Sequence, residues 1–171
     1  PSVIYTSVAG NDTVRFFNQM AEYGVNKNVV LVGASGTVTS QNLAAIGKAA
    51  EGFVTGAGYS PKLDNPQNRK FVADFQAAYK TLPDLYGADS YGLMYFLKTA
   101  AEKAKSVETD KLRVAMRDHE WMTPQGTKRM RAGDHQAMQE MYAVRIEKGD
   151  FNIIGRVTPA DAIGPDACTR F

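Results

Sequence analysis

The stretch LPDLYGADSYGLMYFLKTAAEKA, residues 82–104, sets large rings among very small residues. Tyr86 and Tyr91 stand beside Gly87 and Ala88 in the first turns of a predicted helix. A tyrosine offers a wide contact surface and one hydroxyl, which suits the edge of a pocket where small neighbours leave room for a ligand. The alternative is packing between helices. Both interpretations stay open for Tyr86, whereas Tyr91 is expected to pack.

Two glycine-containing segments each follow a predicted strand. GASGT (33–37) offers glycine and hydroxyl groups that suit a small ligand, but it has no lysine in phosphate-loop spacing, and an ordinary loop fits equally well. Gly56-Ala57-Gly58 lacks the third glycine of a dinucleotide loop, and the SPKLDNP that soon follows it prevents an immediate helix. These features argue against a nucleotide cofactor.

Metal and catalytic chemistry find little support in the sequence. The only histidines are His119 and His135, and a zinc site wants more ligands at tighter spacing. No pair of carboxylates stands near a glycine-rich turn. We therefore expect no metal, no cofactor and no catalytic residue. The single cysteine, Cys168, is either a free thiol or the disulfide partner of a cysteine outside these residues.

The composition is that of an ordinary globular protein. Of 171 residues, 44% are hydrophobic and 22% charged, and 20 basic and 18 acidic residues are spread along the chain. This balance predicts no nucleic-acid partner. No apolar run reaches the roughly 18 residues that cross a bilayer, and the opening PSVIYTS has no basic region typical of a signal peptide. Location must be inferred from other features.

The first sixty residues alternate between strand and helix patterns. We predict strands at 2–8, 28–35 and 51–60, and helices at 13–24 and 40–50. Asn11 or Asp12 would cap the first helix, and Gly24 would end it. Such alternation predicts an α/β fold with a Rossmann-like parallel sheet, whose ligands bind beyond the carboxyl ends of the strands.

The remaining residues follow a different pattern. Residues 67–118 predict three helices, the last capped by Thr109 or Asp110; residues 123–137 suggest a turn-rich connection, and residues 140–157 a hairpin turning at EKGD. The middle helix is apolar around most of its circumference, so it must be covered from more than one side. Three strands and two helices are too few for that. Part of the fold is therefore missing from this chain or is supplied by a partner.

Several segments together resemble a known family. They are PSVIYTSVAGNDTVRFFNQMAEYGV, LVGASGTVTSQNLAAIGKAAEGFVTGAGYSP, NPQNRKFVADFQAAYKTLPDLYGADSYGLMYFLKTAAEKA and YAVRIEKGDFNIIG. In this order they resemble the second half of the periplasmic solute-binding proteins of ABC transporters for branched-chain amino acids. The likeness covers nearly the whole chain, and the PDAC near the C-terminus is close to tails that end in cysteine in this family.

The resemblance implies a non-enzymatic protein of two lobes that close around a small-molecule solute. Residues 1–62 would belong to the second lobe, 63–140 would be helices of the first lobe, and 141–171 would be returning hinge strands and tail. The missing N-terminal half of the same protein would be one partner and a membrane ABC permease another. The location would be periplasmic, or extracellular with a lipid anchor in a Gram-positive organism.

The resemblance also carries over ligand-binding positions, one by one. These are the loop after the first strand, the loop after the second, and the start of the middle helix: Ser7, Val8, Ala9, Ser35, Gly36, Tyr86 and Ala88. Leucine-binding relatives place an aromatic ring near Ala9 and an acid at Ser35, which pairs with the ligand ammonium. The neutral Ser35 removes a charge-assisted bond of roughly 1.5–3 kcal/mol. We therefore expect an aromatic acid or amide without a free ammonium at that end.

Two other functions fit parts of the sequence. A sensory receptor could use the same fold to report a ligand, and a membrane segment or signalling domain in the full gene would favour it. A small α/β enzyme could use GASGT as an anion loop, and turnover lost in a Ser35→Ala variant would favour that.

Overall fold

The computed structural model describes residues 1–166, which form two compact units. The first unit combines Pro1–Ser60 with Met141–Arg156, and the second combines Pro61–Glu140 with the segment that begins at Val157. Cys168 lies outside the described residues, so both interpretations of its thiol stay predictions.

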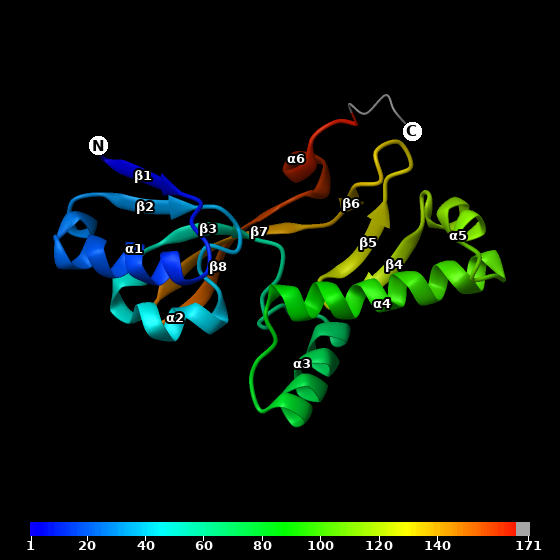
Figure 1. The fold of residues 1–171 in the computed structure, drawn as a ribbon, viewed down its shortest axis with the longest axis horizontal. Coiled ribbons are helices and arrows are strands. Elements are labelled where there is room, and N and C mark those ends of the chain that lie inside the picture. Colours follow the sequence, from blue (N-terminus) through cyan, green and yellow to red (C-terminus); the bar gives the residue numbers. More distant parts are fainter. Residues whose placement is uncertain (167–171) are drawn as a thin grey trace. The chain divides into compact units, whose positions relative to one another are not determined.

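A five-stranded sheet forms the framework of the first unit (Figure 1). Its strands, in spatial order, are β1 (Val3–Thr6), β2 (Val30–Gly33), β3 (Val54–Ala57), β7 (Met141–Glu147) and β8 (Asp150–Val157). The first three strands pair in parallel, which confirms the predicted α/β fold with a parallel sheet, whereas β7 pairs antiparallel to β3. The predicted hairpin turn is also confirmed: Lys148 and Gly149 have φ of 56° and 75°, as tight hairpin turns require.

Two helices cover one face of this sheet. Figure 1 shows α1 (Asn11–Glu22) and α2 (Ser40–Ile46) on the same side of β1–β3. Short 3-10 turns follow each helix, at Val25–Lys27 and Gly47–Ala50. Phe17 of α1 is fully buried, and its ring meets that of Phe53 edge-on at 5.0 Å between centroids. The buried core around them also contains Leu31, Val38, Leu43, Ile46, Ala50 and Ile146.

The other face of the same sheet is largely uncovered. Because side chains alternate along a strand, Val3 and Tyr5 of β1 point away from the core, in register with Val30 and Val32 of β2. Val3, Tyr5 and Val30 are 51%, 66% and 52% exposed. Parallel sheets are normally covered on both faces. We call this apolar surface, Val3, Tyr5, Val30, Val32 and Val54, the outer face.

The helix ends depart from two predictions. Gly10 occupies the cap position of α1, without a side-chain bond, so the prediction that Asn11 or Asp12 caps it is wrong. In the later helix α5 (Thr109–Met116), Glu108 occupies that position without a side-chain bond, so the cap predicted there one or two residues later is wrong as well. Each helix begins at the earlier of the two residues that we predicted as its cap, Asn11 and Thr109. Gly24, with φ 67°, follows α1 as expected.

The second unit contains three long segments of helix, as predicted: α3 (Pro66–Tyr79), α4 (Leu85–Ala104) and α5 (Thr109–Met116). A three-stranded antiparallel sheet follows, made of β4 (Glu120–Thr123), β5 (Gly126–Met130) and β6 (Ala137–Met138), with the short α6 (Pro159–Ile163) beyond. Residues 123–137 are therefore not the turn-rich connection that we expected. The strand GTKRM escapes sequence reasoning because its inward side chain is a lysine rather than an apolar residue.

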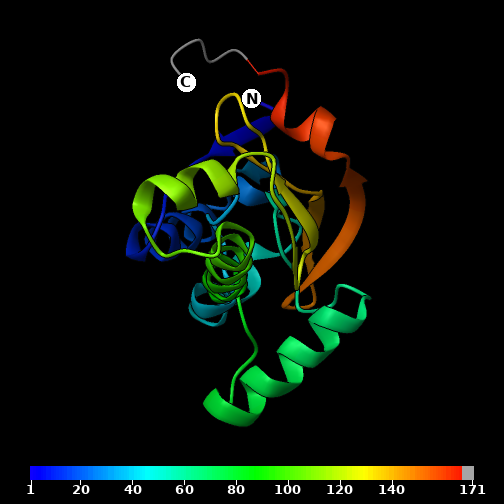
Figure 2. The same cartoon turned by 90° about the vertical axis from the view of Figure 1, so that its right-hand side faces the viewer.

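Helix α4 is the centre of the second unit, with α5 and the β4–β5 hairpin beside it (Figures 1 and 2). Ala88, Gly92, Phe96 and Ala100 form its buried face. An apolar stripe on another side stays exposed: Tyr86, Leu93, Met94 and Leu97. Despite this apolar character, no helix within residues 1–166 is both long and apolar enough to span a membrane.

Candidate functional site

The loops after β1 and β2 lie at one edge of the first unit's sheet. Thr6 and Gly33 are paired in register at the ends of these strands, and the Ala34 amide donates to the Thr6 carbonyl at 2.9 Å. Ser7, Val8 and Ala9 continue from the first strand, and Ser35 and Gly36 from the second. The fold thus brings these five predicted positions to the same edge, as parallel strands require.

Two buried hydroxyls fix the shape of this edge. The Thr13 hydroxyl donates to the Val8 carbonyl at 3.2 Å, which ties the first loop to α1. The Thr55 hydroxyl lies 2.9 Å from both the Gly33 and Ala34 carbonyls, which holds the start of the second loop. Sequence reasoning missed both threonines, since their role depends on pairing between distant strands. They position the loops rather than face solvent.

The exposed part of this edge is polar but uncharged. Ser7, Ala9 and Ser35 are exposed, and the segments 7–10 and 34–37 contain no charged residue. Gly36 has φ 83°, a conformation that glycine adopts without strain. The loops therefore offer hydroxyl and backbone hydrogen-bonding groups without a full charge.

Contacts at the start of α4 show why small residues occur there. The Asp84 side chain caps the helix by accepting a bond from the Gly87 amide at 2.9 Å. A methyl group at Gly87 would lie 3.4 Å from the Phe75 ring, and one at Gly92 only 3.1 Å from Thr123. The space beside Gly92 is therefore filled by protein, and the idea that this glycine leaves room for a ligand is wrong. At Gly87 a methyl group would make only an ordinary contact with Phe75.

The two predicted positions on α4 differ in exposure. Tyr86 is 59% exposed and presents its ring at the surface, whereas Ala88 is fully buried. Tyr91 packs as expected, with its ring 4.7 Å from Phe71 and 4.9 Å from Tyr95 between centroids. The hydrogen bond between the Tyr91 and Tyr95 hydroxyls, together with burial, raises the pKa of Tyr91 to about 12. Of the α4 positions, Tyr86 alone combines a predicted role with a surface position.

A polar cluster next to Tyr86 was not found from sequence. Oδ1 of Asp89 accepts bonds from Nζ of Lys128 at 2.8 Å and from Nε2 of Gln125 at 2.6 Å. Lys128 and Gln125 are buried, and they come from the β4–β5 hairpin. A buried lysine needs such a counter-charge. The cluster anchors the hairpin to α4 and leaves no charge of Lys128 for a ligand.

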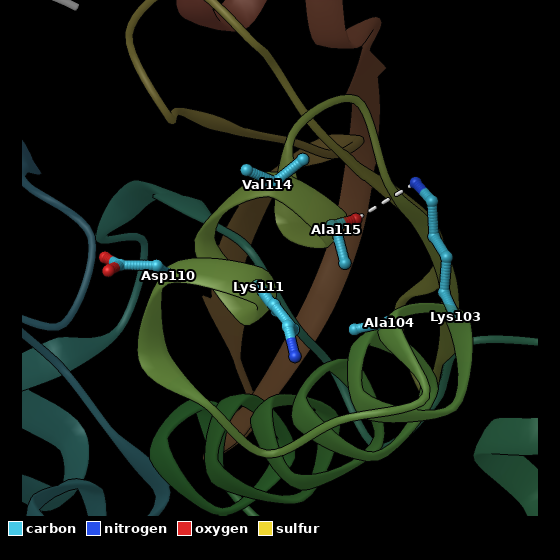
Figure 3. Close-up of a pocket in the computed structure, with 6 residues that line it drawn as sticks. All are labelled: Lys103, Ala104, Asp110, Lys111, Val114 and Ala115. Atoms are coloured by element: carbon cyan, nitrogen blue, oxygen red, sulfur yellow. Dashed lines mark hydrogen bonds between the residues drawn. The ribbon is translucent and has the colours of Figure 1, made fainter.

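An open groove of about 530 Å³ lies between the end of α4 and α5 (Figure 3). Lys103, Ala104, Asp110, Lys111, Val114 and Ala115 line it. Lys103 donates to the Ala115 carbonyl at 3.0 Å, the dashed line in Figure 3, and Lys111 pairs with Glu108 at 3.0 Å. Both lysine ammonium groups therefore already have partners within the chain. None of the predicted ligand-binding residues lines this groove.

The two histidines lie in different parts of the second unit and do not form a site together. His119 lies 2.8 Å from the Thr99 hydroxyl, and burial, followed by the charge of Lys103, lowers its pKa. His135 lies in a loop with φ 57°. Within the described residues, no group of three metal-binding side chains comes together.

The chain matches the periplasmic binding protein family over residues 1–150, and it belongs to that family. Among curated proteins, a Leu/Ile/Val-binding protein homolog 6 from Brucella melitensis is 26% identical over 152 residues. That match covers 83% of this chain and 37% of the relative, so the chain spans only about a third of that relative's length.

The solved structures similar to this chain include solute-binding proteins of ABC transporters. One from Rhodopseudomonas palustris, in complex with benzoate, is 25% identical with a TM-score of 0.82, and the match covers 93% of this chain and 44% of that one. A leucine-binding protein from Thermotoga maritima is 20% identical with a TM-score of 0.82, covering 94% and 46%. These relatives are transporter solute-binding proteins, not enzymes, and they share the expected fold.

Proposed function

We propose that this chain is the C-terminal half of a solute-binding component of an ABC importer. The match along residues 1–150 to the periplasmic binding protein family, on a chain less than half as long as its relatives, carries this proposal. The complete protein would capture a small solute between two lobes and present it to a membrane permease. It would work in the periplasm, or outside a Gram-positive cell on a lipid anchor.

The bare surfaces of both units support a missing N-terminal half. The outer face of the sheet exposes Tyr5 and Val30, and α4 exposes Leu93 and Met94. Apolar surface of this extent on a sheet and a helix marks a site of contact with further protein. We infer that the missing half supplies a layer for each, with residues 63–140 belonging to the first lobe.

The solute that we propose is a small aromatic or other carboxylate, with an amino-acid-like molecule as the alternative. Ser7, Val8, Ala9, Ser35 and Gly36 would contribute hydrogen bonds from the loops after β1 and β2. Tyr86 would contribute a ring, and the buried Ala88 would hold the helix turn that carries it. The neutral loops favour a solute that brings no ammonium group to this edge. Structural relatives include complexes with benzoate and with p-hydroxybenzoic acid.

Calorimetric titration of the complete protein tests this assignment. We expect benzoate to bind and leucine to bind at least tenfold more weakly. Tyr86→Ala should weaken benzoate binding about tenfold, equivalent to about 1.4 kcal/mol. Tyr79→Ala, which removes a 67% exposed ring from α3, is the matched control and should have no effect. Binding of α-amino acids alone would contradict the proposed solute class.

A second variant should reverse the preference for benzoate over leucine. Ser35→Glu places a carboxylate where leucine-binding relatives have one, so leucine affinity should rise and benzoate affinity should fall, each about tenfold or more. Ser40→Glu adds the same charge at the exposed start of α2 and should change neither. Turnover of a bound compound that is lost in Ser35→Ala would instead support the enzyme alternative. A signalling domain in the complete gene would favour the receptor.

A further inference from the structure

A second cavity lies entirely within the second unit, between α4, α5, β5 and the loop that follows β5. It has a volume of about 180 Å³, which is enough for a small organic molecule. Its lining consists of Phe96, Arg113, Met116, Arg117, Met130 and His135. None of these residues belongs to the solute site proposed above.

The floor of this cavity is apolar and held by aromatic packing. The Phe96 ring is 95% buried, and its centroid lies 4.4 Å from that of Trp121 and 5.7 Å from that of His119. The half-buried Met116 and Met130 complete the floor. Methionine side chains adapt to the shape of a bound group. Such a floor suits an aromatic ring or a branched aliphatic body.

The rim is basic, because two exposed arginines contribute to the lining. Arg113 lies in the last turn of α5, Arg117 directly follows the helix, and both line the cavity. Arg113 approaches Asp110 only at 3.8 Å, and both side chains are largely exposed, which makes a weak pair. Guanidinium groups bind carboxylates through paired, planar hydrogen bonds. The rim therefore favours an anion.

This cavity also lies apart from the surface that further protein would cover. Phe96 packs against Trp121 of β4. The exposed stripe residues Leu93, Met94 and Leu97 do not line the cavity. A missing layer seated on the stripe would leave the cavity reachable from the α5 side.

The geometry points to an accessory binding site in this cavity for a small organic anion with an apolar body, such as a monocarboxylate carrying a ring. The ring rests on Phe96, Met116 and Met130, and the carboxylate meets Arg113 and Arg117. An inorganic anion would leave the apolar floor uncovered, and a neutral ring would leave the guanidinium groups without a partner. The site is independent of the interlobe solute site.

Methyl NMR of the complete protein, labelled at methionine and titrated with benzoate, tests the proposal. The methyl signals of Met116 and Met130 should shift with a common affinity, because a bound ring perturbs methyl groups beside it. The methyl signal of Met20 in α1 serves as the reference and should not shift. Benzamide, a neutral molecule of the same shape, should bind at least tenfold more weakly. Equal shifts with benzamide, or none with benzoate, would overturn the site.

Variants separate this site from the interlobe one. The double change Arg113→Gln and Arg117→Gln should weaken the Met116 and Met130 response at least tenfold without unfolding, since both side chains are exposed. Arg15→Gln, a 77% exposed arginine of α1, is the matched control. Tyr86→Ala should leave the two methyl shifts intact while it weakens the calorimetric binding. A methyl response unchanged in the double variant would refute the assignment.

Discussion

The two faces of the first unit's sheet differ sharply although they share the same strands. One face meets α1 and α2 and buries Phe17, Leu31 and Phe53, while the outer face leaves Tyr5 and Val30 more than half exposed. A parallel sheet is normally buried on both sides. The contrast teaches that one face of the sheet carries a complete layer of helices, while the other presents the apolar surface to which we assign the missing half.

The second unit repeats the contrast on a single helix. Helix α4 turns Ala88, Gly92 and Phe96 inward and Leu93 and Leu97 outward. Gly92 on the inner side allows close contact with Thr123 of β4. Our proposal of a missing half accounts for the apolar surface on both elements.

Truncating the covered face should have the largest effect. Phe17→Ala removes a fully buried ring and should lower the free energy of unfolding by about 3–5 kcal/mol. Urea denaturation measures the change. Tyr23→Ala, at the 77% exposed end of the same helix, should change stability by less than about 0.5 kcal/mol. Equal losses for the two variants would contradict the contrast between the buried and the exposed side of α1.

Adding one methyl group at Gly33 or at Gly56 compares the packing on the two faces of the sheet. At Gly33 on the covered face, a Cβ would lie 2.6 Å from the Thr6 carbonyl and 2.7 Å from the Phe53 ring, so Gly33→Ala should cost about 1–3 kcal/mol. At Gly56 on the outer side of β3, a Cβ meets nothing within 4 Å. Gly56→Ala should therefore be close to neutral in denaturation experiments, and a large loss there would contradict the proposed contrast.

The outer face should respond differently in the short chain and in the complete protein. Val30→Thr keeps the shape and strand preference of the side chain but adds a hydroxyl. We expect a change within about 0.5 kcal/mol in this chain, where the position is 52% exposed. In the complete protein, burial of the hydroxyl should cost about 1–2 kcal/mol. Identical values in both would argue against a covering layer.

The smallest effect that we expect is a pH dependence in the second unit. Hydrogen bonds from Arg131 lower the pKa of Asp134 to about 2. Because this pKa lies below that of the unfolded chain, near 4, the pair stabilises the fold above pH 4 and loses that effect as the pH falls toward 2. Asp134→Asn should flatten the stability profile in this range, measured by denaturation from pH 2 to 6. An unchanged slope would exclude the pair as its source.

Much of the fold followed from local patterns. Alternating apolar runs and glycine stops predicted the parallel strands and α1, and the EKGD turn predicted the β7–β8 hairpin, since these signals act over a few residues. The strand Gly126–Met130 escaped prediction because its inward residue is Lys128, whose partner Asp89 lies far away in sequence. The helix caps were missed for a similar reason: Gly10 offers no side chain to recognise.

By itself, the sequence determined the class of fold, the family likeness and the loops that follow the strands, because hydrophobic period and short motifs are written locally. Only the tertiary structure decided which residues each side chain meets. It showed that Ala88 is buried while Tyr86 is exposed, and that Gly92 of α4 accommodates Thr123. It also brought Arg117 and Phe96 to one cavity. Such neighbours depend on packing between elements distant in the chain, which no local pattern records.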